Sequence, residues 1–256
     1  MLFTSVVPIL SIVCFVGAAN IKSQDRIIGG ESANIQEVPY QCSLSEDGSH
    51  VCGCSIISPT LILTAAHCLE DVNPSKHNLE IRAGSNKHDD GGVVKKVKSF
   101  IVNPMYNGDS MDNDSGVLRL ESPLAFSNKI KSIEFDDALP VDGIKAIVSG
   151  WGLIKNNGRD LSPVLKKADV TLISRESCMK TAYKNNIKES MFCARGEGTD
   201  ACQGDSGGPI LNVETNKLIG IISFGFDCGS EKNPGVYSSI GRSMKFIEKA
   251  MKTLST

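Results

Sequence analysis

The sequence lacks a large excess of charge of either sign. Its 27 lysines and arginines nearly balance its 29 aspartates and glutamates, which gives a formal net charge of −2. Proteins that bind nucleic acid or an anionic membrane surface carry a concentrated basic field, so neither partner is expected here. The densest basic stretch, residues 95–98, alternates with an apolar residue and is typical of the solvated face of a strand.

The chain also lacks internal repeats and low-complexity linkers, and its one long apolar run lies at the N-terminus. The first twenty residues contain no charged side chain, and the run ends in Gly17, Ala18 and Ala19. Its length and small residues predict a signal peptide over residues 1–19, and therefore a secreted, extracellular protein. A membrane anchor is the alternative, but the run is short for a span of about 20 residues and no basic cluster follows it.

Nine cysteines are present, and Cys14 belongs to the predicted signal peptide. The eight others are Cys42, Cys52, Cys54, Cys68, Cys178, Cys193, Cys202 and Cys228. An even number in an exported chain predicts four disulfides. The alternative is a zinc site built from Cys52, Cys54, His67 and Cys68. Structural zinc sites usually space their cysteines by about two to four residues, which disfavours it.

Short runs of β-branched residues, separated by clusters of glycine, proline, asparagine and aspartate, dominate the rest of the chain. Examples are residues 93–97, 145–150 and 218–224. This punctuation predicts an all-β fold. Only the C-terminus has helical spacing, with apolar residues at Met244, Ile247, Met251 and Leu254. We expect this helix to close the domain, and the polar segment 121–142 to cross between two halves.

A histidine and an aspartate occupy positions that suit acid–base chemistry. His67 ends an apolar strand beside Cys68, which is expected to be tethered by a disulfide, and this anchoring suits a general base held in one orientation. Asp114 opens a strand-like run. Buried against His67, it would fix the imidazole tautomer and stabilise the imidazolium. Asp112 is a neighbouring candidate, and only spacing within the run favours Asp114.

A serine at position 206 is surrounded by glycine, in the stretch Gly204-Asp205-Ser206-Gly207-Gly208-Pro209. Glycine allows backbone conformations that point several N–H groups inward, where they can stabilise the oxyanion formed when a serine attacks a carbonyl. Segments rich in glycine and serine are often plain turns. Six defined residues together nevertheless predict a nucleophile at Ser206.

At these stretches the chain resembles the trypsin and chymotrypsin family of serine proteases. The order His67, Asp114, Ser206 is that family's order rather than the order in subtilisins or α/β-hydrolases. Further matching motifs lie at residues 27–30, 38–41, 149–152 and 233–237. The resemblance implies one peptidase domain over residues 27–256, made of two packed six-stranded antiparallel β-barrels with a C-terminal α-helix and a catalytic cleft between the barrels. It also implies an oxyanion hole formed by the N–H groups of Gly204 and Ser206.

The same resemblance implies an inactive precursor. Family members are cut at the bond that matches Arg26–Ile27, which makes residues 20–26 an activation propeptide and a trypsin-like protease its activator. The new amino group of Ile27 would fold inward to the carboxylate of Asp205, and this buried ion pair would organise the oxyanion hole and the pocket. The uncut chain is therefore expected to be nearly inactive.

Specificity is implied by Asp200, which matches the floor of the primary pocket in trypsins. Gly225 and Gly235 match the two glycines of the pocket walls, and Tyr183 matches a residue that supports the pocket. A buried carboxylate in an open slot would pair with Arg or Lys and reject apolar side chains. The alternative is a surface aspartate, because the residues just before Asp200 also have turn composition.

Several positions depart from vertebrate trypsins in ways more typical of an invertebrate enzyme. In the loop that matches their calcium site, Ser85 stands where a glutamate is expected and Lys87 adds a positive charge, so no calcium is expected. No other metal or cofactor is implied. Phe224 stands where relatives usually carry tryptophan and still offers an apolar face to the substrate. Asp227 replaces a common glycine at the pocket rim and predicts a bias toward basic residues upstream of the cut.

Three disulfides follow by resemblance: they join Cys52 to Cys68, Cys178 to Cys193 and Cys202 to Cys228. Cys42 and Cys54 are left over. Both lie six residues from Gly48, inside the turn-forming residues 46–49, so a hairpin that turned there would place them opposite each other. At a non-hydrogen-bonded antiparallel pair the Cα separation is about 4.5 Å, within reach of a disulfide. We therefore predict a fourth, cross-strand disulfide.

The expected function is a secreted endopeptidase that hydrolyses peptide bonds after Arg or Lys, with a digestive role favoured by the short propeptide. Its expected partners are protein and peptide substrates, the activating protease and protein protease inhibitors, and it is expected to act as a monomer. The alternative is a catalytically silent homologue that acts as a binding or regulatory module, although all three catalytic residues are present. A glycosylation sequon at residues 113–115 overlaps Asp114 and is expected to stay unmodified.

Overall fold

The structure is a computed structural model that describes residues 30–73, 76–153, 158–196, 201–226, 228 and 232–255. The predicted signal peptide, the propeptide and the Arg26–Ile27 bond lie outside these residues, as do Asp200 and Asp227. Within the described ranges, no helix has the length and apolar character needed to cross a membrane.

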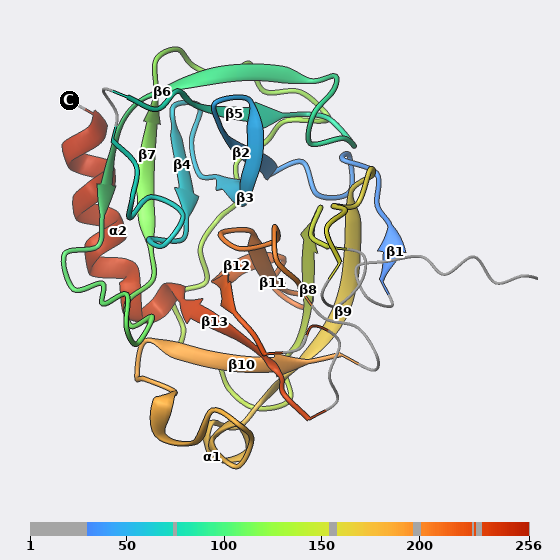
Figure 1. The fold of residues 1–256 in the computed structure, drawn as a ribbon, viewed down its shortest axis with the longest axis vertical. Coiled ribbons are helices and arrows are strands. Elements are labelled where there is room, and N and C mark those ends of the chain that lie inside the picture. Colours follow the sequence, from blue (N-terminus) through green and yellow to red (C-terminus); the bar gives the residue numbers. More distant parts are fainter. Residues whose placement is uncertain are drawn as a thin grey trace, which may run out of the picture.

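Six strands close into the first barrel, in the order β2-β3-β4-β7-β6-β5 (Figure 1). They are β2 (Gln41–Glu46), β3 (Ser49–Ile56), β4 (Leu61–Thr64), β5 (Leu79–Ala83), β6 (Val93–Val102) and β7 (Gly116–Leu120). Alternate residues point inward, as in β5, where Leu79, Ile81 and Ala83 are buried and the residues between them are not. The basic residues 95–98 lie in β6, the strand of this barrel with the most exposed side chains.

The second barrel is formed by strands β8 to β13, with the short β1 added at its edge. They are β1 (Glu31–Ser32), β8 (Lys145–Gly150), β9 (Lys166–Ile173), β10 (Met191–Arg195), β11 (Pro209–Asn212), β12 (Lys217–Phe224) and β13 (Gly235–Ser239). The order is β1-β9-β10-β13-β12-β11-β8, and an additional β9–β8 pairing closes the six main strands. Residues 121–144 lead from β7 to β8 and cross between the barrels.

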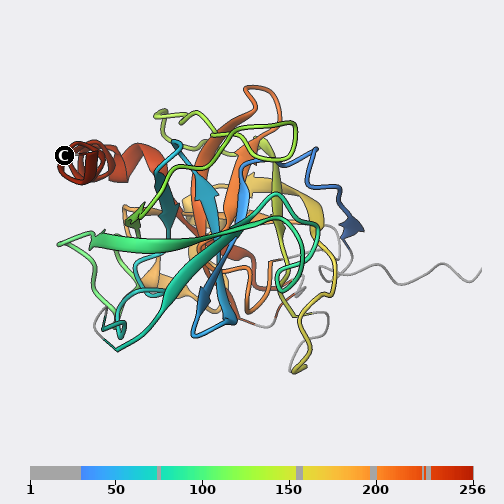
Figure 2. The same ribbon diagram turned by 90° about the horizontal axis from the view of Figure 1, so that it is seen from above.

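The C-terminal helix α2 (Ile240–Ser255) lies along the side of the molecule and packs against β7 and β12 (Figures 1 and 2). Its apolar stripe, including Ile247, Ala250 and Leu254, is buried, while its lysines face outward. The architecture confirms the predicted fold of two six-stranded barrels with a C-terminal helix.

A short helix, α1 (Arg175–Met179), precedes a single 3-10 turn, η1 (Lys184–Asn186), and neither was predicted. The hydroxyl of Ser174 caps α1 by accepting the N–H of Ser177 at 3.1 Å. An element of little more than one turn cannot show an apolar repeat, so the sequence carries no periodic signal for it.

Four disulfides join the described cysteines, in the pairs Cys42–Cys54, Cys52–Cys68, Cys178–Cys193 and Cys202–Cys228. In the β2–β3 hairpin, Cys42 lies directly opposite Cys54 with a Cα separation of 4.9 Å. One detail of the expected geometry was wrong. The N–H of Ile56 donates to the carbonyl of Tyr40 at 2.8 Å, and this hydrogen-bonded pair lies two residues from the cysteine pair. Hydrogen-bonded and non-hydrogen-bonded pairs alternate along an antiparallel ladder, so Cys42 and Cys54 also form a hydrogen-bonded pair.

Candidate active site

His67 and Asp114 are brought together by two neighbouring strands of the first barrel. His67 follows β4 and Asp114 precedes β7, and these strands pair directly. Nδ1 of His67 lies 2.8 Å from Oδ2 of Asp114, and the backbone N–H of His67 donates to Oδ1 at 3.0 Å. Ser223, in β12 of the second barrel, donates its hydroxyl to Oδ2 at 2.6 Å. The carboxylate thus accepts three hydrogen bonds, one of them from the other barrel.

The burial of this pair is uneven. The Asp114 side chain is fully buried, whereas 23% of the His67 side chain is exposed. With the Nδ1 hydrogen directed at Asp114, the neutral imidazole carries its lone pair on Nε2. The exposed edge of the ring can therefore accept a proton from a group in the cleft.

Asp112, the other candidate aspartate, hydrogen-bonds to Ser190 rather than to His67. It accepts a hydrogen bond from the hydroxyl of Ser190, and the same hydroxyl accepts the backbone N–H of Asn113 at 3.0 Å. Ser190 is buried and directly precedes β10 of the second barrel. The Asp112–Ser190 hydrogen bond therefore connects the loop before β7 to the second barrel. Of the two candidate aspartates, Asp114 is the one that hydrogen-bonds to the histidine. The Asn113 side-chain amide is half-buried and donates to the carbonyl of Met105 at 3.3 Å.

Ser206 lies in a tight turn before β11 whose backbone requires glycine. Gly204 and Gly207 have φ values of 93° and 80°, in the left-handed region. A Cβ on Gly207 would lie 2.2 Å from Oγ1 of Thr64, so the turn is also pressed against β4. Ser206 and His67 line the same cleft, of about 250 Å³. Among the described residues, the His67 ring hydrogen-bonds to Asp114 and not to Ser206, and Sγ of Cys68, a disulfide sulfur without a hydrogen, lies 3.8 Å from Nε2. A hydrogen bond between a general base and its nucleophile is often long before substrate binds.

Asp205 is buried directly beside this turn. Its carboxylate accepts the N–H groups of Gly152 at 2.7 Å and Cys202 at 2.9 Å, and no ion pair reaches it from the described part of the chain. Burial raises the pKa of Asp205 to about 6, although the two backbone hydrogen bonds lower it. A buried carboxylate in this state would gain from a cationic partner.

His50 also contacts the turn, and sequence reasoning missed it. Its Nε2 lies 2.9 Å from the carbonyl oxygen of Gly204, and its Nδ1 lies 2.7 Å from the hydroxyl of Ser43. A carbonyl can only accept, so Nε2 carries the hydrogen and Nδ1 accepts from Ser43. Burial lowers the pKa of His50 to about 4. No local pattern could mark this contact, because its partners are 154 residues apart.

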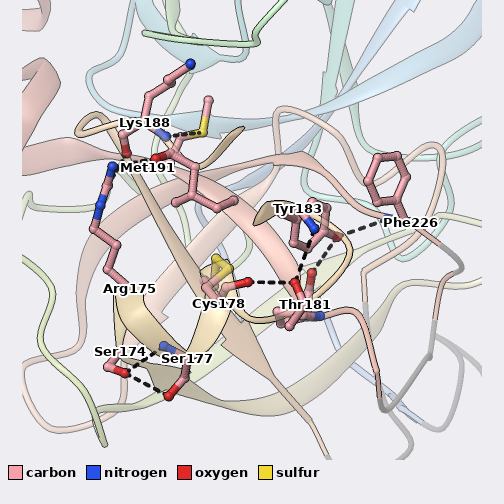
Figure 3. The surroundings of a disulfide bond; sticks show 12 residues. Ser174, Arg175, Ser177, Cys178, Thr181, Tyr183, Lys188, Met191 and Phe226 are labelled. Atoms are coloured by element: carbon pink, nitrogen blue, oxygen red, sulfur yellow. Dashed lines mark hydrogen bonds between the residues drawn. A yellow bond between two sulfur atoms is a disulfide. The ribbon is translucent and has the colours of Figure 1, made fainter. Parts of the chain in front are cut away.

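A pocket opens beside Ser206 between the segments that carry Gly225 and Gly235. A Cβ on Gly225 would lie 4.0 Å from the Cα of Gly235, so a side chain there would fill the gap between the walls. Tyr183 joins the outer ends of both walls: its hydroxyl donates to the carbonyl of Pro234 at 2.7 Å and accepts the N–H of Phe226 at 3.0 Å. Figure 3 shows Tyr183 beside Phe226, and their rings stack with centroids 5.0 Å apart.

Within the described ranges, few groups around the cleft could bind a metal ion. One cluster of described residues has the spacing of a metal site, and it consists of Cys52, His67 and Cys68. Both sulfurs are bonded to each other in a disulfide, so they offer no thiolate and the zinc alternative fails. In the loop that was compared with a calcium site, Nζ of Lys87 lies 3.1 Å from Oδ2 of Asp90. An ammonium group thus already pairs with a carboxylate of that loop.

Comparison with known proteins agrees with this geometry. The sequence profile of the Trypsin family matches residues 27–247. The chain is 43% identical to Trypsin beta of Drosophila erecta over 217 residues, 84% of each chain. It is 42% identical to Trypsin alpha of Drosophila melanogaster over 217 residues, 84% of this chain and 83% of the relative. Among solved structures, neuropsin, a serine protease expressed in the limbic system of mouse brain, superposes with a TM-score of 0.79 at 31% identity and covers 87% of this chain and 98% of its own. The chain therefore belongs to the trypsin family of serine proteases.

Proposed function

We propose that the chain is an endopeptidase that cleaves after Arg or Lys, with Ser206 as nucleophile, His67 as general base and Asp114 as the group that orients the base. The observation that carries this proposal is the hydrogen-bonded His67–Asp114 pair, whose free ring edge faces the same cleft as Ser206. A general base oriented by a buried carboxylate beside a serine is the arrangement required for acyl transfer.

The proposed reaction runs in two halves. Nε2 of His67 takes the proton of the Ser206 hydroxyl while its oxygen attacks the carbonyl carbon of the substrate, and the resulting oxyanion is stabilised by the N–H groups of Gly204 and Ser206. The imidazolium, paired with Asp114, gives its proton to the leaving amine as the peptide bond breaks. Water then attacks the acyl-serine by the same proton transfers, which releases the acid and restores Ser206.

Preference for Arg and Lys is assigned to Asp200, which lies outside the described residues. The pocket supports the assignment because Gly225 and Gly235 leave it open to a long side chain. A carboxylate at its floor would pair with a guanidinium or ammonium group and would be left uncompensated by an apolar side chain. The rim residue Asp227 also lies outside the description, and its bias toward basic upstream residues stays a prediction.

Activation is assigned to cleavage of the Arg26–Ile27 bond by a trypsin-like protease. Asp205 supports it, because this buried carboxylate has a raised pKa and would be stabilised by the released amino group of Ile27. The same ion pair would hold the turn that carries Gly204 and Ser206. We further propose a secreted monomer that digests proteins and is open to protein protease inhibitors, with the signal peptide at residues 1–19.

The proposal is tested by cutting the precursor after Arg26 and comparing matched peptide amides that differ only in Arg, Lys or Phe before the scissile bond. We expect a kcat/KM for Arg and Lys at least about 10³-fold above that for Phe, and no turnover by a Ser206→Ala variant. Equal rates for Phe would refute the specificity. Absence of hydrolysis despite a verified Ile27 terminus would instead favour the catalytically silent homologue.

A further inference from the structure

Two disulfides involve cysteines of one three-residue segment of β3, residues 52–54. Cys52 is bonded to Cys68, the neighbour of His67, and Cys54 is bonded to Cys42 on β2. Cys42 and Cys54 are fully buried, and Cys52 is nearly so. Gly53 is therefore fixed from both sides by covalent links to other parts of the first barrel.

Gly53 is also the point where the first barrel touches the backbone of Ser206. Its N–H donates to the carbonyl of Ser206 at 2.7 Å, and its carbonyl accepts the hydroxyl of Thr64 at 2.9 Å. Because the Cys42–Cys54 rung is hydrogen-bonded, the adjacent Ser43–Gly53 rung is not, and the polar groups of Gly53 point away from β2. The register of the hairpin thus makes this N–H available to Ser206.

The peptide group between Ser206 and Gly207 is held from its other side by the second barrel. The N–H of Gly207 donates to the carbonyl of Ile222 at 2.7 Å. One barrel therefore binds the carbonyl of this peptide and the other binds its N–H. A peptide plane fixed at both ends sets the direction in which the Ser206 side chain leaves the backbone.

The contact between Gly53 and the turn that carries Ser206 is tightly packed. A Cβ on Gly53 would lie 2.9 Å from the Cα of Gly208 and 3.2 Å from the carbonyl oxygen of Asp205. A Cβ on Gly207 would lie 2.6 Å from the carbonyl oxygen of Gly53. A shift of β3 by a few tenths of an ångström would therefore move the turn that carries Ser206.

The Cys42–Cys54 bond is not expected to add more global stability than the other three disulfides, and its chain-entropy contribution is close to that of Cys178–Cys193. Its sequence separation is 12, the smallest of the four disulfides, whereas the others span 15, 16 and 26. The strands that it joins are already paired along their length. Closing so short a loop removes the least entropy from the unfolded chain.

We propose that the Cys42–Cys54 disulfide is a positioning element for the nucleophile: it holds Gly53 in place, and Gly53 holds the carbonyl of Ser206. The inference rests on the proposed role of Ser206. The Cys52–Cys68 bond connects the same segment of β3 to the neighbour of His67. The two disulfides therefore fix the positions of the base and of the nucleophile relative to one segment, residues 52–54.

The test uses the Arg26-cleaved protein with both cysteines replaced, Cys42→Ala with Cys54→Ala. We expect kcat on an arginyl amide, and the rate of modification by diisopropyl fluorophosphate, to fall about 10-fold, because a small misplacement of reacting atoms is costly. KM and the inhibition constant of benzamidine should stay within about twofold, since the pocket is untouched. Wild-type kcat in this variant would overturn the inference, whereas an unreactive wild-type protein would refute the proposed function itself.

A matched control removes the Cys178–Cys193 disulfide, which spans 15 residues and packs with Tyr183 behind the pocket. Replacing both of these cysteines by Ala should raise KM and the benzamidine constant and leave the fluorophosphate rate nearly unchanged. Equal loss of kcat in both variants would show a general stability effect and contradict positioning. Should the first variant not fold, Gly53→Ala keeps all four disulfides and should lower kcat without raising KM. A folded Gly53→Ala protein with wild-type kcat would overturn the proposal as well.

Discussion

Asp205 is the residue at which the pH dependence of the uncut precursor is expected to concentrate. Burial raises its pKa from 3.8 to about 6, so the folded chain holds this proton more tightly than the unfolded chain does. The favourable contribution is complete below about pH 4 and is lost as the pH rises through 6. A shift of about two units corresponds to about 3 kcal/mol of unfolding free energy.

Replacing the carboxyl group should therefore stabilise the precursor at high pH. We expect Asp205→Asn to raise the unfolding free energy of the uncut chain by about 1 to 2 kcal/mol at pH 8, because the gain is partly offset by one lost hydrogen bond to a backbone N–H. At pH 4 the gain should vanish. Urea unfolding at both pH values measures this, and destabilisation of equal size at pH 4 and pH 8 would contradict it.

Asp114 and Asp112 provide a matched pair for testing which aspartate orients the base. Asp114→Asn should lower kcat by about 10⁴-fold, because an amide cannot hold the imidazole in the tautomer that leaves Nε2 unprotonated. Asp112→Asn removes the same charge two residues away, at a side chain that bonds to Ser190 instead. We expect it to keep kcat within about 10-fold, since only a structural hydrogen bond is weakened. Steady-state kinetics of the two activated variants decides between them.

Among the structural elements, the two pocket walls depend on Tyr183, which bonds to one backbone group in each. Tyr183→Phe removes both hydrogen bonds and should raise KM for arginyl amides and the benzamidine constant by about 10-fold, with kcat nearly unchanged. Tyr40→Phe is a suitable control, because Tyr40 is buried but does not line the cleft. A fall in kcat without a change in KM would show that Tyr183 does not act through the pocket.

In the loop of residues 84–91, a lysine side chain already pairs with one of the loop's carboxylates. Lys87 pairs with Asp90, and the hydroxyl of Ser85 donates to the carbonyl of Asp90 at 2.6 Å. A calcium ion bound at 100 times its dissociation constant would add about 2.7 kcal/mol of stability. We expect the melting temperature to be the same in excess chelator and in millimolar calcium. A rise of about 5 °C or more with calcium would show that the loop binds the ion.

The β2–β3 hairpin shows why an element can be predicted correctly from an incomplete argument. Asp47 and Gly48, with φ values of 51° and 84°, form a two-residue turn that by itself would place Cys42 opposite Gly53. A bulge between Leu44 and Ser45 shifts the register by one residue and brings Cys54 into line. The turn residues are visible in the sequence, but the bulge depends on packing that no local pattern records.

At the scale of the whole molecule, the site is assembled by contacts that join the barrels. Ser223 reaches Asp114, Gly53 reaches Ser206 and His50 reaches Gly204. The residues proposed to react could be singled out from the sequence because each lies in a dense local motif. The residues that contact them from the other barrel could not be predicted. A serine or glycine in a strand has no distinguishing sequence neighbours, and its partner is more than a hundred residues away in the chain.

The central claim is that His67 and Asp114 activate Ser206 once the Arg26–Ile27 bond is cut. The most direct measurement is the stoichiometry and position of diisopropyl fluorophosphate modification, determined by peptide mass analysis. The cleaved protein should carry one adduct per chain, on Ser206, and the uncut precursor and a cleaved His67→Ala variant should react far more slowly. An unmodified Ser206 in the cleaved protein, or equally fast modification of the His67→Ala variant, would contradict the account.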